Sequence, residues 1–352
     1  MLIFAAAVFA SSSTSVTRAA QVSNLYSAEV PVPDKAPAAR DVAFSTALKS
    51  VLIKLTGKRS PQTSSLVAGA IREPAQYVEQ FQYRTLTLEP IDETELGSEE
   101  LLLWTQFDAV AVDRLLGEAN LPRWGHTRPS VLVWLALENE STRDLVGETE
   151  SSTLIEVLKD AASRRGVPLI IPLLDENDRT RLTVADVWAG FDDAIAVAST
   201  RYHPDAILIV RGHQTGGGEW QSRWRLSIGD LPSNWVATDS RLDVVLVEGI
   251  DRTADALAAR YAGVVGVANA GGDRVPLSVS SVRSVSDYAR VLEYLTGLDG
   301  VSRVDVTGVD ADELTIGVEA RGGASVVAQI ISLGRTLMPV PGGSSLQYRL
   351  RP

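Results

Sequence analysis

The residues of this chain that are best suited to chemistry are four aspartates. Asp175 and Asp178 follow an apolar run that is typical of a buried strand, and Asp186 and Asp192 lie a little further on. Sites in α/β proteins often lie just beyond the carboxyl ends of the strands, so these four residues form a candidate acidic site. One hypothesis is therefore a hydrolase that uses the carboxylates near Asp175, Asp186 and Asp192.

The same aspartates also have simpler explanations. A calcium loop has oxygen ligands at alternate positions and a glycine at the sixth, whereas Arg179 and Thr180 occupy the fifth and sixth positions here. A solvated acidic loop explains this segment better than a divalent-ion site does. Asp192 or Asp193 would also suit the cap of a following helix.

Other catalytic patterns do not occur in the sequence. The chain has no cysteine, which excludes disulfides, thiolate metal ligands and a cysteine nucleophile. Its three histidines lack the close spacing of a metal site, and the HExxH, GxSxG and SxxK motifs do not occur. Gly57-Lys58-Arg59-Ser60 ends like a phosphate-binding loop, but Leu52 stands where that loop needs a glycine. We predict no catalytic, cofactor-binding or metal-binding residues.

Tryptophan is the most unusual feature of the composition, with seven in the chain. Trp220, Trp224 and Trp235 fall on two stretches that read as an antiparallel pair, and Trp220 and Trp224 are spaced to share one strand face. Trp188 lies in the same part of the chain. A tryptophan-rich core is the simpler interpretation. The alternative is an exposed aromatic patch for a protein partner or a glycan, with these four tryptophans as candidate binding residues.

The charge of the chain argues against two kinds of partner. A formal net charge of −11 repels nucleic-acid phosphates and anionic lipid headgroups. The arginines are scattered along the sequence, which predicts no concentrated basic patch. We therefore expect no nucleic-acid partner.

The first twenty residues read as an export signal. Leu2 to Ala10 is an apolar run of about nine residues, the length of a signal-peptide core and too short to span a bilayer. Small residues suit cleavage after Ala10 or Ala19, although no basic residue precedes the run. No later run of about 18 apolar residues predicts a membrane span. We expect a periplasmic protein, with the signal either cleaved or retained as an N-terminal anchor.

The pattern of strands and helices predicts a mixed α/β and α+β protein of three small modules after a signal at residues 1–20. These are an N-terminal α+β domain at 21–128, a mixed-sheet α/β domain at 129–271 and a ferredoxin-like domain at 272–352. In the first, a helix begins near Pro37 and ends at Gly57, and a second helical stretch breaks at Pro74.

The middle and C-terminal modules have their own signals. Residues 130–137 and 206–211 are apolar runs that predict strands covered on both faces, and 167–174 reads as a third. Residues 219–228 and 235–246 predict an antiparallel pair, followed by a helix that begins at Asp251. The order β-α-β-β-α-β after residue 272 is typical of the ferredoxin-like fold.

Several blocks of the sequence resemble the bacterial domain-of-unknown-function family 2066. They are Val22–Val32, Leu102–Asp108, Leu121–Gly125, Arg128–Trp134, Pro172–Asp175 and Val184–Trp188. The resemblance implies an exported protein and brings no catalytic residues. The stretch Ala198–Arg211 is similar, at the level of fold, to the sheet domains of curli-secretion-type lipoproteins, penicillin-binding-protein activators and the N-terminal domain of the Tol propeller protein.

Together these observations favour a non-catalytic periplasmic scaffold or adaptor that binds an envelope protein partner. The alternatives are the carboxylate hydrolase and a glycan-binding module that uses the predicted hairpin tryptophans.

Overall fold

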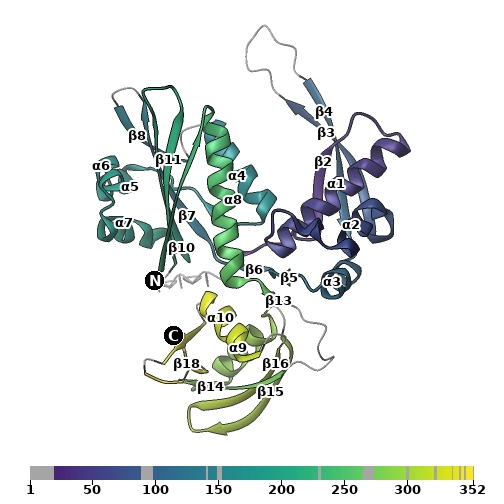
Figure 1. Ribbon diagram of the computed structural model, residues 1–352. Coiled ribbons are helices and arrows are strands. Elements are labelled where there is room, and N and C mark those ends of the chain that lie inside the picture. The colour runs from purple at the N-terminus through teal and green to yellow at the C-terminus, as the bar shows by residue number, and fades with distance from the viewer. Residues whose placement is uncertain are drawn as a thin grey trace, which may run out of the picture.

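The computed structural model describes residues 20–88, 98–139, 142–148, 153–228, 231–264, 273–298, 301–320, 323–334, 336–340, 342–344 and 346–351. The predicted signal segment up to residue 19 and the glycine-rich break at 269–272 lie outside the described residues. So do Glu93 and Glu95, which belong to an acidic stretch that we expect to form a loop. Within the described ranges the chain combines helices with sheets of three, six and five strands, which confirms the mixed α and β class (Figure 1).

The N-terminal part is an antiparallel sheet with helices packed on it. Its strands, in the order β2-β4-β3, are β2 (Ser27–Pro31), β3 (Val78–Leu88) and β4 (Ser98–Phe107). Its helices are α1 (Pro37–Thr56), α2 (Ser65–Arg72) and α3 (Ala109–Glu118), with 3₁₀ turns at Pro61–Thr63 and Pro74–Tyr77. Both predicted helix signals are confirmed: Pro37 begins α1, and Gly57 ends it with a left-handed φ of 66°.

The middle part is built on a six-stranded mixed sheet. Five strands follow the order β12-β11-β10-β7-β8, and the sixth, β9, pairs with β7. They are β7 (Val131–Asn139), β8 (Thr142–Val146), β9 (Leu169–Ile170), β10 (Ala206–Gln214), β11 (Trp220–Ile228) and β12 (Leu231–Asp239). The β10–β7 and β9–β7 pairs are parallel, and the other pairs are antiparallel.

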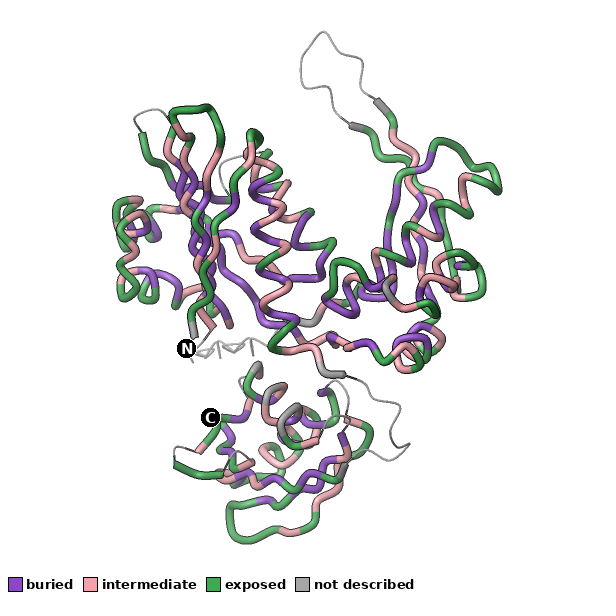
Figure 2. Tube along the Cα trace, in the orientation of Figure 1, coloured by how far each residue is buried: buried purple, intermediate pink, exposed green. Residues whose placement is uncertain are grey.

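Helices lie on both faces of this sheet (Figure 1). One face carries α4 (Thr153–Arg165) and α8 (Leu242–Tyr261), and the other carries α5 (Glu176–Arg181), α6 (Val184–Ala189) and α7 (Asp192–Ser199). Seven consecutive residues of β7, from Val131 to Leu137, are buried because alternate side chains enter the two cores (Figure 2).

Two sequence predictions for the middle part are wrong. The predicted strand at 235–246 ends at Asp239, and α8 begins at Leu242 rather than at Asp251. The run Val244–Val247 reads as a strand by propensity, but tertiary packing overrides it: Val245 and Leu246 are buried against the sheet from within a helix. Of the strand predicted at 167–174, only Leu169–Ile170 pairs with the sheet.

The C-terminal part is a five-stranded sheet in the order β15-β16-β14-β18-β17. Its elements are β14 (Asp273–Ser280), α9 (Val285–Thr296), β15 (Val301–Asp310), β16 (Glu313–Ala320), α10 (Gly323–Leu333), β17 (Leu337–Pro339) and β18 (Gln347–Leu350).

This topology departs from the predicted ferredoxin-like fold. A helical crossover after β16 would bring the last strand back parallel to β16, and therefore antiparallel to β14. Instead the chain forms the additional strand β17 and then turns back, so that β18 runs antiparallel to β17 and parallel to β14. The β-α-β-β-α order is as expected, but the last hairpin changes the direction of the closing strand.

Short ladders join the parts of the chain. β1 (Ala20–Gln21) pairs with β6 (Thr127–Arg128), and β5 (Pro122–Arg123) pairs with β13 (Gly263–Val264). The N-terminal, middle and C-terminal sheets each have their own clusters of buried hydrophobic side chains. The exact boundaries at residues 128 and 271 stay predictions.

A buried arginine lies where the N-terminal part meets the middle part. Arg128 is fully buried, and its guanidinium lies 4.1 Å from the ring centre of Trp124. Its Nε and Nη groups donate, at 2.7–3.1 Å, to the main-chain oxygens of Lys54, Trp124, Gly125, Arg165 and Gly166. These oxygens come from the last turn of α1, the linking segment and the end of α4. One side chain therefore ties together three segments that are distant in sequence.

Lys54, beside Arg128, is a second buried cation. Its Nζ donates to the main-chain oxygens of Ser27 at 2.6 Å and Asn24 at 3.1 Å. Burial lowers the pKa of Lys54 to about 8, and the positive charge of Arg128 acts in the same direction.

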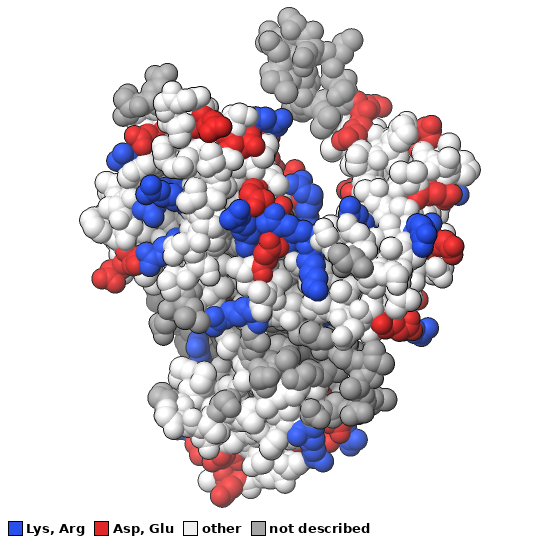
Figure 3. All heavy atoms as spheres, viewed as in Figure 1, with Lys and Arg blue, Asp and Glu red and all other residues white. Residues whose placement is uncertain are grey.

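Ion pairs extend the same junction to the surface. Arg165 is 4% exposed and donates to Asp251 and Asp255 on α8, each at 2.6 Å. Arg59, just after α1, pairs with Glu248 and Asp255, each at 2.8 Å. Figure 3 shows acidic and basic side chains side by side over this central part of the molecule.

Replacing Arg128 by lysine should destabilise the protein by about 3 kcal/mol, because an ammonium has three donors where the guanidinium makes five bonds, so buried carbonyls lose their partners. Chemical denaturation checks this. The control is Arg252→Lys on the surface of α8, which should change the free energy of unfolding by no more than about 0.5 kcal/mol. Equal stability of the two variants would contradict the role given to Arg128.

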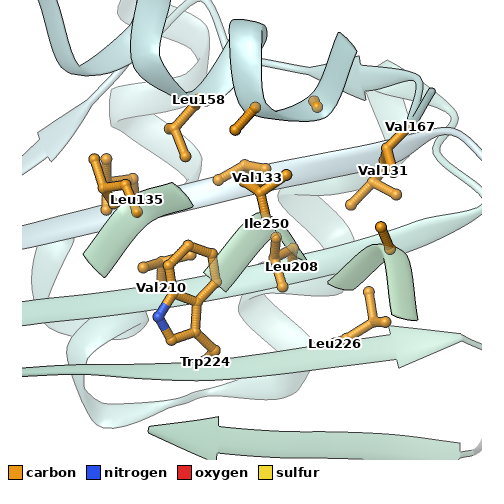
Figure 4. Close-up of a cluster of buried hydrophobic side chains, with 14 of the residues drawn as sticks. Val131, Val133, Leu135, Leu158, Val167, Leu208, Val210, Trp224, Leu226 and Ile250 are labelled. Atoms are coloured by element: carbon orange, nitrogen blue, oxygen red, sulfur yellow. The ribbon is translucent and has the colours of Figure 1, made fainter. Parts of the chain in front are cut away.

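Gly249→Ala should also destabilise the middle part. A Cβ at Gly249, inside α8, would stand 1.9 Å from the Trp224 ring, which lies among Val210, Leu208 and Ile250 (Figure 4). We expect a loss of about 1–3 kcal/mol from overpacking. The matched control is Gly117→Ala in α3, where a Cβ meets nothing within 4 Å, so helix propensity should leave it neutral or slightly stabilised. Thermal unfolding of both variants measures the difference.

Candidate functional site

Asp178 is a buried carboxylate held by its neighbours. It is 1% exposed and accepts hydrogen bonds from the main-chain N–H of Leu174, from Arg201 at 2.9 Å and from the hydroxyl of Tyr202. The Tyr202 hydroxyl in turn accepts from the N–H of Leu173. Burial, together with the hydrogen bond to Asp178, raises the pKa of Tyr202 to about 12. This carboxylate joins the loop after β9 to the 3₁₀ turn Thr200–Tyr202, which follows α7.

Asp175 lies in the same cluster. It caps α5 by accepting from the N–H of Asp178, and both its oxygens accept from Arg201, at 2.7 and 3.0 Å. The hydrogen bond from Arg201 and the one from the main chain hold the pKa of Asp175 at about 2. The structure therefore brings together Asp175 and Asp178 of the predicted acidic site, through a basic partner that the sequence did not indicate.

The other two predicted aspartates have different partners. Asp186 forms a capping box with Thr183 at the start of α6, and these hydrogen bonds lower its pKa. Asp192 lies in the first turn of α7 and pairs with Arg225 at 2.7 Å. The N-cap of α7 is Phe191, with no side-chain cap bond, so the predicted aspartate cap is wrong.

These partners define what the acidic residues do locally. Each of the four carboxylates accepts hydrogen bonds from a cation, a hydroxyl or a main-chain N–H group. Within the described residues, no group of three or more acidic or histidine side chains is placed to hold a metal ion. The arrangement is that of caps and ion pairs that hold loops in place.

The four candidate tryptophans lie on two different faces of the middle sheet. Trp224 pairs with Trp235 across β11 and β12, and their rings stack at 6.2 Å. Trp224 is 2% exposed and donates to Ser222 at 2.6 Å. Trp220 shares this face by register. An exposed patch that includes Trp224 is therefore wrong, because α8 covers that face.

Trp188 lies on the other side of the sheet, near the end of α6. It is partly exposed, and the guanidinium of Arg143 lies 4.4 Å from its ring centre. Its main-chain oxygen accepts from Arg211 at 2.9 Å. Binding roles for Trp188, and for the partly exposed Trp220 and Trp235, stay predictions.

A groove of about 450 Å³ opens on the outer face of the middle sheet, which is the face that carries α5, α6 and α7. Its walls come from α7, the segment before β10, and the strands β10, β11 and β12. Apolar lining comes from Ile195, Ile207, Ile209, Pro204 and Pro232. The Asp192–Arg225 ion pair also lines it, together with Ser227 and with Asp205, whose carboxylate accepts from Ser130. Asn234, Val236 and Thr238 of β12 are exposed, so the sheet beyond α7 is open on this face.

Sequence reasoning missed the basic side of this face. Arg211 of β10 and Arg223 of β11 are directly paired in register, and Arg225 follows two residues later. Side chains two apart point to the same face, so the three arginines gather although they are scattered in the sequence. The prediction of no concentrated basic patch is therefore wrong. In Figure 3, basic side chains gather by the strands next to α6 and α7. The two-residue spacing of Arg223 and Arg225 in a predicted strand could have indicated that they share a face.

Comparison with known proteins gives one domain match. Residues 19–125 match the family model of a domain of unknown function, DUF8605. This region includes the N-terminal sheet with α1, α2 and α3, and the middle sheet with its groove lies beyond it. The match supports an uncharacterised domain and assigns no chemistry to it. A search of curated proteins found no match. In the described part of the chain, no helix is both long and apolar enough to cross a membrane.

Asp175→Asn tests the role of the acidic cluster. With a pKa of about 2 in the folded protein, against 3.8 for an ordinary aspartate, Asp175 stabilises the fold above about pH 4, and this contribution is lost as the pH falls through 2. The variant should be less stable than the parent at neutral pH, and the difference should shrink between about pH 4 and 2. Denaturation over that range measures it; a difference that stays constant down to pH 2 would contradict the ion pair with Arg201.

Proposed function

We propose that this protein is a non-catalytic adaptor that binds a segment of a partner protein in the groove between α7 and the strands β10, β11 and β12. The observation that carries the proposal is the groove itself: about 450 Å³, with apolar residues, one ion pair, Asp205 and Ser227 in its lining and an open sheet face beside it. Apolar grooves with a few fixed polar groups are the usual shape of a binding site.

The surroundings of the candidate acids support binding over hydrolysis. A general acid needs a raised pKa, whereas the pKa values of Asp175 and Asp186 are lowered by their partners. Asp178 is buried and bonded to Arg201 and Tyr202, and Asp192 is paired with Arg225. The proposed function therefore gives these residues structural roles, and of the four only Asp192 lines the groove.

The proposal includes export. The apolar run Leu2–Ala10 and the resemblance to family 2066 in blocks from Val22 to Trp188 are its basis. We place the adaptor in the periplasm, with an envelope protein as its partner.

Site-specific crosslinking in cells tests the proposal. A photo-crosslinking residue at Ala196, which is exposed and lines the groove, should capture one envelope protein. The same residue at Asp160, exposed on α4 on the opposite face of the sheet, is the matched control and should not capture it. A second variant, Ala196→Trp, should fill the groove and prevent co-purification of that protein. Equal capture at both positions, or co-purification unaffected by Ala196→Trp, would overturn the proposed function.

A further inference from the structure

Three arginines form a cluster on the outer face of the middle sheet. Arg211 and Arg223 are opposite each other on β10 and β11, and Arg225 is opposite Ile209 one step along the same face. Ile209 is buried among the side chains beneath α7. Because side chains two apart on a strand share a face, the three arginines lie on that same face of the sheet. Arg225 also lines the groove. The cluster is therefore continuous with the proposed binding site.

The positive charges of this arginine cluster exceed the acceptors around it. Arg225 has Asp192 as an ion-pair partner, and Arg211 donates to the main-chain oxygen of Trp188. The Nε atoms of Arg211 and Arg225 are buried and meet no acceptor in the part of the chain that the structure describes. Burial lowers the pKa of Arg211, and the charges of Arg223 and Arg225 lower it further. Like charges in direct opposition across strands destabilise a sheet, so a bound anion would relieve this repulsion.

We propose that the arginine cluster binds acidic side chains of an extended partner segment that lies in the groove. This inference rests on the proposed function and names the chemistry of the partner. Guanidinium groups bind carboxylates in bidentate geometry, and Arg223 is exposed.

Apolar side chains around the cluster indicate that the ligand is a chain segment with apolar residues of its own. Val236 is opposite Arg223 on β12 and is 48% exposed. Phe191 directly precedes Asp192 and is 58% exposed. The groove continues with Ile195 and Ile207. A segment in which acidic and apolar residues alternate matches both the charges and the apolar lining, as at other interfaces with aromatic and arginine anchors.

The same features weigh against other anions. The whole chain carries a net charge of −11, which repels an anionic membrane surface. Attraction of an anion to the arginines is therefore confined to the groove. A free phosphate would use the arginines but none of the exposed apolar side chains. A peptide segment uses both.

Binding of defined peptides to the purified full-length protein tests the proposal. The probe is a short dye-labelled peptide in which glutamate and valine alternate, followed by fluorescence anisotropy, and the comparison peptide has glutamine in place of glutamate. We expect the acidic peptide to bind, with an affinity that falls as salt rises, and the glutamine peptide to bind at least about tenfold more weakly.

Arg223→Glu should weaken binding of the acidic peptide by about tenfold or more. Arg223 is exposed, so the variant should fold normally, which circular dichroism checks. The matched control is Arg283→Glu in the C-terminal part, an equal change of charge at a side chain that is 77% exposed, and it should leave binding nearly unchanged. Equal weakening by both variants would mean a non-specific charge effect and would overturn the proposal.

Two further outcomes would also overturn it. One is displacement of the peptide by inorganic phosphate alone. The other is that the protein binds phosphatidylglycerol vesicles and not the peptide, and that Arg223→Glu abolishes the vesicle binding. Failure here is distinguishable from failure of the proposed function. If crosslinking from Ala196 persists in Arg223→Glu cells while neither peptide binds, the groove binds a partner by other chemistry. If crosslinking from Ala196 fails in the parent protein, the proposed function itself is wrong.

Discussion

The constraint on which the rest of the structure depends is the burial of Arg128 between the N-terminal and middle parts. A buried guanidinium is costly unless all its donors are used, and here every one has a main-chain acceptor. Because those acceptors belong to the ends of α1 and α4 and to the linking segment, the arginine holds the two helix ends together. Gly166, with a left-handed φ of 64°, completes the fit, since a Cβ there would stand 2.4 Å from the guanidinium.

Fixing α4 has consequences for the middle sheet. α4 and α8 pack together on one face, and the Arg165 and Arg59 ion pairs hold α8 against the end of α1. Beneath these helices the face is closely packed, as the contact of Trp224 with Gly249 shows. In the described ranges the opposite face carries three short helices, α5, α6 and α7, and β12 is exposed beyond α7. The groove exists because the two faces are covered unequally.

The charges of the protein are distributed in the same unequal way. Around the junction, basic and acidic groups alternate, and the four candidate aspartates have their own hydrogen-bonding partners. On the open face, by contrast, Arg211, Arg223 and Arg225 have one ion-pairing aspartate, Asp192, within the described residues. This excess charge beside the groove is the basis of the recognition surface that we propose.

The sequence by itself determined the local features: the class of the fold, the beginning of α1 at Pro37 and its end at Gly57, and the buried strand at 131–137. These follow from periodicity and from the fixed conformations of proline and glycine, which act within a few residues. Only the tertiary structure decided which face each tryptophan takes, where α8 begins and how β17 reverses the last strand. It also decided that three scattered arginines form one cluster, because strand register sets that proximity and register depends on contacts between distant segments.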